Sequence, residues 1–250
     1  MSGLVFICLM AAVVIAVVLP ILFTAGMLIL RKLKVLQLLK GLFIGIVVNS
    51  FFLPFVFSAM LLFFQVKEVV SWKMFLCFIP YSLVTLAMLY FFCIKAMRLM
   101  EEPENCFSMM LGFAYIPMYS FSQTAFDNLI IGDHIRIGNL EYIYKLGYEN
   151  AESVIATFDV MHISYFLAVG FQAIAILFIQ LLIIQLICVY AENRGTSYLC
   201  LSFLMIFIQQ VSMYSSAVLT SWSLLLMVLC MIALSTALAQ RLKKEGFIGT

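Results

Sequence analysis

Charged residues are scarce in this chain of 250 residues, of which only 10% are Asp, Glu, Lys or Arg. Soluble domains contain roughly 25%. Six stretches contain none of these residues, and each is at least about as long as the roughly 20 residues that an apolar helix needs to cross a bilayer. They are residues 1–30, 41–66, 74–94, 105–126, 160–191 and 195–240. A water-soluble core could not bury this much apolar sequence, so we predict an all-α, polytopic membrane helix bundle.

Residues that usually perform catalysis or bind metals are also scarce. Only two histidines occur, His134 and His162, and no Asp or Glu pair lies in the middle of an apolar stretch. The chain has no H-E-x-x-H, G-x-S-x-G or P-loop motif. We therefore assign no catalytic residue, no metal site and no cofactor. A net charge of +2 without a basic stripe gives no reason to expect a nucleic-acid partner.

The longest charge-free stretch must hold two helices. As one helix, residues 195–240 would be about 69 Å long, more than twice the thickness of the hydrocarbon core. A break is predicted in the hydroxyl-rich segment 215–223. One integral membrane domain, residues 1–250, then has seven transmembrane helices, over about 4–30, 42–65, 74–95, 107–127, 162–190, 198–216 and 222–240.

Basic residues orient this bundle, because cytoplasmic loops carry an excess of Lys and Arg. If the N-terminus is outside, the inner side receives Arg31, Lys32, Lys34, Lys40, Lys95, Arg98, Arg194, Arg241, Lys243 and Lys244. The outer side receives only Lys67, Lys73, Arg136 and Lys145. We therefore predict the N-terminus outside and the C-terminus inside. The absence of an N-x-S/T sequon favours a bacterial cytoplasmic membrane.

The connection over residues 128–161 is predicted to be a long outer loop. It is acidic and carries tyrosines between its charges, so part of it is expected to lie against the lipid headgroups. Asn150 followed by Ala151 is a helix start that leads toward the fifth crossing. A solvated connection and a binding segment are both compatible with this composition.

Neutral polar residues gather in the outer halves of the later predicted helices. Because lipid offers them no hydrogen-bond partners, they are expected to face other helices. They either form hydrogen bonds between helices or line an outward-open polar cavity. The predicted cavity residues are Tyr119, Gln123, Asp127, Gln172, Gln209 and Gln210. Gly41 and Gly45, four residues apart, predict close helix packing at the start of the second helix.

The order of helices and loops also suggests a family. Two helices are separated by Arg31-Lys32-Leu33-Lys34, a later helix begins Leu111-Gly112-Phe113, and a long loop follows it. The next helix contains residues 171–176 and runs into Tyr190-Ala191-Glu192-Asn193-Arg194. This layout resembles the YhfC family of intramembrane protease homologues, whose relatives include the non-catalytic seven-helix scaffold subunit of gamma-secretase.

The resemblance implies a Glu-Glu-x-x-Arg motif on the third helix, where this chain has Tyr90-Phe91-Phe92-Cys93-Ile94-Lys95-Ala96. On the fourth helix the residues 111–117 replace a Gly-His-Gly-Gly-x-Glu pattern. Gln172 and Gln209-Gln210 stand where histidine or acid would be expected. No catalytic residue is carried over, and the resemblance implies a degenerate homologue.

These observations favour a non-enzymatic multi-pass protein of the plasma membrane. It is expected to bind or scaffold a membrane segment or a hydrophobic ligand, so its partners would be the bilayer and another membrane protein or a hydrophobic peptide. A small permease or transporter subunit is the alternative. An active membrane hydrolase built on His162 or an unrecognised serine comes third.

Overall fold

The described part of the chain is helical throughout. The computed structural model describes residues 3–30, 33–66, 72–96, 103–145, 151–160, 163–193 and 195–215, together with 228, 229, 231–233 and 240, and contains no strand within them. Its helices are α1 (Gly3–Val13), η1 (Val14–Val18), α2 (Leu19–Ile29), α3 (Val35–Ile46), η2 (Val47–Phe52), α4 (Leu53–Phe63), α5 (Trp72–Phe91), η3 (Phe92–Ala96), α6 (Pro103–Ile137), α7 (Leu140–Lys145), α8 (Ala151–Val160), α9 (Ile163–Asn193) and α10 (Thr196–Ser215). The elements η1 and η2 are single π-helical turns within longer helices, and η3 is a π-helical turn that directly follows α5.

Four helical units are long and apolar enough to cross a membrane. They are Gly3–Ile29, Val35–Phe63, Trp72–Lys95 and Ile163–Ala191, and Thr196–Ser212 is a shorter apolar helix. The second unit begins at Val35, ahead of the predicted residue 42, because a single exposed lysine, Lys40, does not interrupt a helix. Of the predicted helix 222–240, most residues lie outside those that the structure describes.

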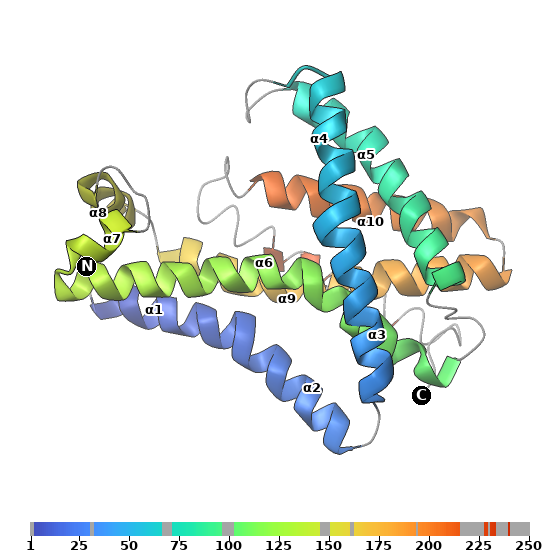
Figure 1. Cartoon of the computed structure of the whole chain (residues 1–250), viewed down its shortest axis with the longest axis horizontal. Helices are drawn as coiled ribbons and strands as arrows, with labels where there is room; N and C mark the ends of the chain where they lie inside the picture. The colour runs from blue at the N-terminus through green and yellow to red at the C-terminus, as the bar shows by residue number, and fades with distance from the viewer. Residues whose placement is uncertain are drawn as a thin grey trace.

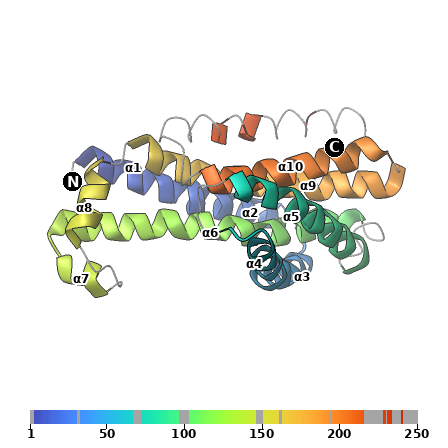
Figure 2. The same ribbon diagram turned by 90° about the horizontal axis from the view of Figure 1, so that it is seen from above.

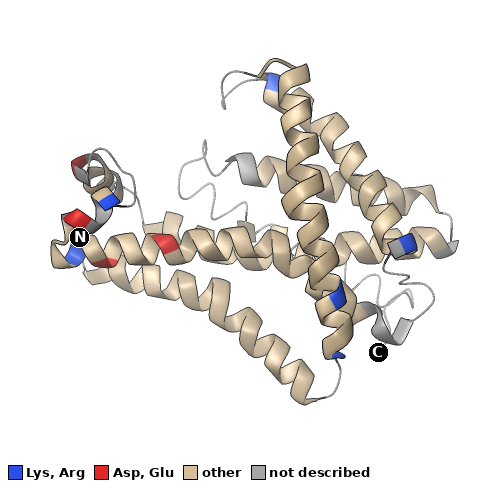
Figure 3. Ribbon diagram, viewed as in Figure 1, with Lys and Arg blue, Asp and Glu red and all other residues tan. Residues whose placement is uncertain are grey.

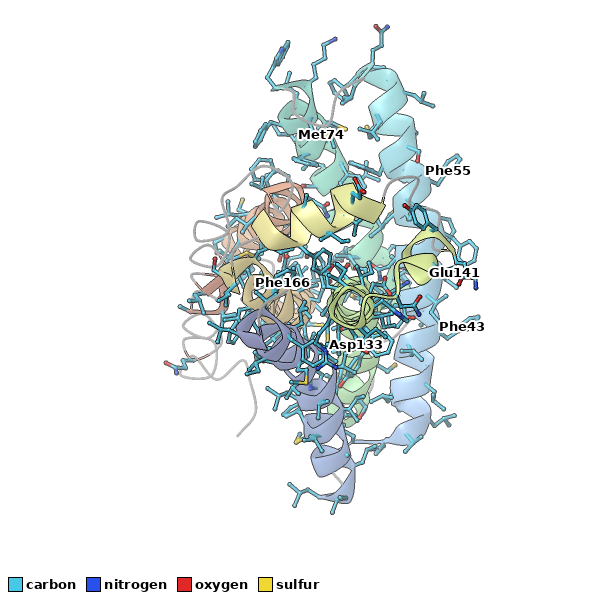
Figure 4. All side chains as sticks on the ribbon, turned by 90° about the vertical axis from the view of Figure 1, so that its left-hand side faces the viewer. Phe43, Phe55, Met74, Asp133, Glu141 and Phe166 are labelled. Carbon is cyan, nitrogen blue, oxygen red and sulfur yellow. The ribbon has the colours of Figure 1, made fainter. Side chains whose placement is uncertain are left out.

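Helices α6 and α9 form the centre of the fold (Figure 1). Seen from above, α3–α4 lies on one side of α6, and α9 with α10 lies on the other (Figure 2). Helix α1 and η1 pack against both α6 and α9, and Ala12 and Ala16 belong to one apolar cluster with Ala125, Val169 and Ala173. The share of the most apolar stretch that is buried is 72% in α9 but only 11% in the α3–α4 unit. In Figure 4, Phe43 and Phe55 of that unit project away from the body of the protein.

Glycines set the closest contact of the fold, between α3 and α6. A Cβ atom on Gly41 would stand 2.0 Å from the Met109 carbonyl oxygen, and one on Gly112 would stand 2.0 Å from the Leu38 carbonyl oxygen. Gly45 meets the backbone of Phe113 in the same way, at 2.9 Å. The predicted close packing at Gly41 and Gly45 is therefore confirmed, and the two backbones touch without side chains between them.

Two π-helical turns each precede a proline. Turn η1 ends two residues before Pro20, and η2 ends two residues before Pro54. A proline ring crowds the carbonyl four residues before it and offers that carbonyl no N–H, and a wider turn makes room for the ring. The carbonyl of Ala16, four residues before Pro20, accepts a hydrogen bond of 2.8 Å from the Ser122 hydroxyl of α6. A side chain of the central helix thus supplies a donor to the backbone at this turn.

The connection predicted over 128–161 is largely helical. Helix α6 does not end near Asp127 but continues to Ile137, because Ile131 is buried against Leu9 and Phe166. Gly138, at φ +73°, then ends the helix, as glycine can at no steric cost. Helix α8 begins at Ala151, where the sequence predicted a helix start. Figure 3 shows charged residues gathered at this end of the molecule. Asp133 and Arg136 of α6 form an ion pair of 2.9 Å.

Candidate functional site

A cavity of about 600 Å³ opens between five of the described helical units. Its wall is built by the η2–α4 region, α5, α6, α9 and α10. The lining residues are Asn49, Ser50, Leu53, Pro54, Phe57, Met74, Phe78, Tyr81, Thr85, Leu89, Ile116, Pro117, Tyr119, Ser120, Gln123, Gln180, Ile206, Gln209 and Gln210. The volume lies within the range of about 300–1,000 Å³ that is usual for small-molecule sites.

The wall combines neutral polar groups with apolar ones. Ten of the nineteen lining side chains carry an amide or a hydroxyl group, and none of the nineteen is charged. The apolar part includes Phe57 and Phe78, whose rings stack at 6.4 Å between centroids. Phe57 also meets Tyr81 edge-on at 5.1 Å. The cavity therefore offers hydrogen bonds on one part of its wall and an aromatic surface on another.

The polar groups lie near the middle of their helices. Asn49 is the central residue of Val35–Phe63, Ser120 is the central residue of α6, and Gln180 lies three residues past the centre of Ile163–Ala191. From the sequence, the neutral polar residues were expected in the outer halves of the later helices. In the structure, α6 and the α3–α4 unit are longer than predicted. Asn49 and Gln180 therefore lie near the middle of two helical units that are long and apolar enough to cross a membrane, and polar groups at the middle of a membrane-crossing helix lie deep in the hydrocarbon.

The cavity has a buried floor and an exposed mouth. Gln180 and Gln209 on the floor are only 5% and 4% exposed. Tyr119 is 63% exposed, and Ser50 and Gln123 are exposed as well. The mouth thus lies between the η2–α4 region and α6, on the side of the bundle rather than at its ends.

One hydrogen bond joins the two floor glutamines. Gln180 Nε2 on α9 donates to Gln209 Oε1 on α10, at 2.9 Å. The other amide atom of Gln180, Oε1, is buried and has no hydrogen-bond partner among the described residues. A buried acceptor without a partner costs about 1–3 kcal/mol, so this atom favours the arrival of a donor.

Four of the six residues that the sequence assigned to a polar cavity lie on its wall: Tyr119, Gln123, Gln209 and Gln210. Asp127 is exposed, one helical turn beyond Gln123, and is not part of the wall. Gln172 is buried elsewhere between α9 and α10, where its Nε2 lies 3.4 Å from the carbonyl and hydroxyl oxygens of Ser212. Gln172 therefore joins two helices and does not face the cavity.

Gln180 is one cavity residue that sequence reasoning missed. It stands eight residues after Gln172 in a run without charge, so both amides gave the same signal of a polar group within an apolar helix. Which of them faces an empty space depends on the packing of α5, α6 and α10. Asn49 was missed because only the fold brings η2 to this point.

Groups suited to metal binding are not gathered anywhere in the described part of the chain: no cluster of three or more His, Cys, Asp or Glu occurs there. His134 lies near the end of α6, well beyond the cavity-lining residues of that helix. His162, the predicted alternative for hydrolysis, lies outside the described residues.

Comparisons with models of known families, with curated proteins and with solved structures found no match for this chain. The candidate site is therefore interpreted from its own geometry and chemistry.

Proposed function

We propose that this chain is a non-enzymatic membrane protein that binds a hydrophobic ligand or a membrane segment in the cavity. The observation that carries the proposal is the neutral polar wall near the middle of apolar helices. Polar groups at this depth find no partners in lipid. They are stable when they bond to one another, to water or to a bound molecule, and the unpartnered Gln180 Oε1 favours the last of these.

The chemistry of the wall supports binding rather than catalysis. Hydroxyl groups such as Ser50, Thr85 and Tyr81 are weak nucleophiles unless an adjacent base activates them. Among the described residues that line the cavity there is no His, Cys, Asp, Glu or Lys to serve as that base. The amides and hydroxyls present can donate and accept hydrogen bonds, which is sufficient for recognition.

A photo-crosslinking experiment tests the binding function. The purified protein in lipid nanodiscs is incubated with a diazirine-bearing fatty alcohol, irradiated and digested, and the labelled peptides are identified by mass spectrometry. We expect saturable labelling of peptides that contain the cavity wall. Labelling that stays proportional to probe concentration, spread evenly over exposed helix faces, would refute binding of a lipid-like ligand in the cavity.

Two matched variants locate the bound probe. Ser50 is exposed at the mouth, so Ser50→Trp should block entry at little cost to folding. Ser58 is exposed on the following helix α4 and does not line the cavity, so Ser58→Trp adds the same ring elsewhere. Only the first variant is expected to reduce the labelling of the wall.

The topology belongs to the same proposal. We propose seven crossings with the N-terminus outside and the C-terminus inside, in a bacterial cytoplasmic membrane, because the basic residues are distributed in that way. Fusion of the C-terminus to alkaline phosphatase or to a fluorescent protein tests it. Inside placement predicts fluorescence and no phosphatase activity, and the reverse result requires an even number of crossings or an inverted bundle.

A small permease is the second candidate. It is favoured by the position of the cavity near mid-depth, which is usual for transporter sites, and by Pro54 and Pro117 in its wall. Binding alone predicts saturable labelling without flux. Uptake of a probe into proteoliposomes, reduced by Ser50→Trp but not by Ser58→Trp, would favour the permease.

Kinship with the YhfC family is also proposed, as a degenerate homologue without catalytic residues. It predicts that an experimental structure of a family member superposes on α1 to α10 with the same helix order. If the helix that corresponds to α6 in the family member were not central to its fold, the proposed kinship would be refuted.

A further inference from the structure

We infer that the cavity binds an uncharged amphiphile of lipid size whose polar head donates a hydrogen bond, as a hydroxyl or an amide N–H does. This inference rests on the proposed binding function and selects the ligand class for the same site. It depends on three properties of the cavity, which are its volume, its lack of charge and the unpartnered Gln180 Oε1.

The volume favours a lipid-like molecule over a membrane helix. A helix with its side chains is about 10 Å wide, so about 600 Å³ holds only about 8 Å of helix, or roughly five residues. A membrane-crossing segment needs about 20 residues. The cavity can therefore enclose the head and part of the chain of an amphiphile, but not a second transmembrane helix.

The wall favours a neutral head. The nineteen described lining residues offer no opposite charge to a carboxylate, phosphate or ammonium group. Moving an ion into such a site without a partner is costly, and a neutral hydroxyl or amide avoids that cost. Ten amide and hydroxyl side chains can meet a neutral head from several directions.

The floor specifies a donor. Gln180 is 5% exposed, its Nε2 is engaged with Gln209 Oε1, and its own Oε1 is buried and unpaired among the described residues. A small rotation of the Gln180 side chain is needed to turn this closed atom toward the cavity; an alcohol or a primary amide can then pair it, whereas an acceptor-only head such as an ester cannot. A site that hydrogen-bonds a donor discriminates against an analogue that lacks it, because its buried polar group would remain unpaired.

The apolar part of the wall receives the chain of the amphiphile. Phe57 of α4 and Met74 and Phe78 of α5 line the cavity and belong to one apolar cluster. The side-facing mouth lies next to Phe51 and Phe55, which are 67% and 75% exposed. An amphiphile dissolved in the bilayer can thus enter sideways from the hydrocarbon.

A competition experiment with one common chain tests the ligand class. The full-length protein in nanodiscs binds tritiated oleyl alcohol, and unlabelled oleyl alcohol, oleamide, methyl oleate and oleate compete for it. We expect the alcohol and the amide to compete at least roughly fivefold better than methyl oleate, about the value of one net hydrogen bond. Oleate, measured at pH 9, should compete more weakly still.

Two glutamines on α9 provide a matched pair of variants. Gln180→Met removes the proposed acceptor and should bring oleyl alcohol and methyl oleate to equal affinity. Gln172→Met removes an equally buried amide that bonds to Ser212 and does not line the cavity, so it should keep the fivefold preference. A purely structural role of Gln180 would lower all affinities together and leave their ratio unchanged.

Each failure has a separate meaning. Equal competition by methyl oleate in the natural protein overturns the donor requirement, while saturable binding still supports the proposed function. Saturable binding of a single-span hydrophobic peptide, with none of oleyl alcohol, overturns the lipid class in favour of a membrane segment. If neither probe binds saturably, the proposed function itself fails.

Discussion

Helix α9 and the α3–α4 unit are almost equally apolar, yet the protein buries one and exposes the other. Their most apolar stretches have mean hydropathies of 2.6 and 2.2, but 72% of the first is buried and only 11% of the second. In water, the exposure of so apolar a segment as α3–α4 would be very costly, because exposed apolar surface is unfavourable. In a bilayer it is not, since lipid chains are as apolar as leucine.

What distinguishes the two segments is the placement of small and polar residues. In α3 and η2 the buried positions Gly41, Gly45 and Val48 form one narrow stripe at helical spacing. In α9, buried residues lie on several faces, and the buried amides Gln172 and Gln180 both point to α10. Small residues mark close backbone contact, and polar residues mark faces that avoid lipid.

The largest effect is expected where the exposed segment touches the centre. In Gly41→Leu the new side chain would collide with the backbone of Met109, which cannot rotate away. Overpacking usually costs about 1–3 kcal/mol, and a collision with backbone should reach about 3 kcal/mol or more. Thermal unfolding in nanodiscs should show a large loss of stability or no folded protein.

Gly26→Leu is the matched control for this substitution. Gly26 lies in the exposed helix α2, and a Cβ atom there has no described neighbour within 4 Å. Its unfolding temperature should stay close to that of the natural protein. If both leucines were equally harmful, the stripe at Gly41 would not be the anchor of the α3–α4 unit, and the comparison with α9 would lose its basis.

Four of the seven helices predicted from the sequence correspond to helical units long and apolar enough to cross a membrane, because charge is excluded from the hydrocarbon wherever the helix faces. The sequence also predicted the Gly41 contact and placed Tyr119, Gln123, Gln209 and Gln210 among polar groups that now lie on one cavity wall. These features depend on residue chemistry and local spacing alone.

Two features of the fold could not be predicted from residue chemistry and local spacing. Helix α6 carries Tyr, Ser, Gln and Thr side chains through its middle, so it lies outside the four most apolar spans although it is the central helix. Gln172 and Gln180 have the same local sequence signal, and only tertiary packing decides that one bonds to Ser212 and the other faces the cavity.

A second pair of substitutions compares the buried helix α9 with the exposed helix α3 directly, and its expected effect on stability is smaller. Ile183 of α9 is fully buried, whereas Phe43 of α3 is 67% exposed. In a membrane the unfolded reference also lies in lipid, so truncation removes packing and leaves a cavity without the usual transfer term. Ile183→Ala should cost about 1–3 kcal/mol, and Phe43→Ala less than about 0.5 kcal/mol, measured by reversible unfolding in bicelles.

If Phe43→Ala cost more stability than Ile183→Ala, the contrast between the exposed α3 and the buried α9 would have to be revised. A larger loss for Phe43→Ala would mean that the face of α3 that is exposed here is covered in the membrane by another protein. Crosslinking from position 43 would then identify that neighbour, whereas lipid contact predicts adducts with lipid alone.

The smallest effect tests how the other exposed segment, α1–α2, is held to the centre. The Ser122 hydroxyl donates to the Ala16 carbonyl, which stands four residues before Pro20, and we expect it to substitute for the N–H that proline lacks. Ser122→Ala should therefore cost about 0.6–2 kcal/mol, the usual range for hydrogen bonds between membrane helices. Pro20→Ala restores an N–H within reach of that carbonyl, so Ser122→Ala should cost less than about half as much in the Pro20→Ala background.

A double-mutant cycle of unfolding free energies measures this coupling. If the two changes were additive, the hydroxyl would not substitute for the missing donor, and its remaining contact, 3.3 Å to the Met118 carbonyl of its own helix, would account for the whole effect.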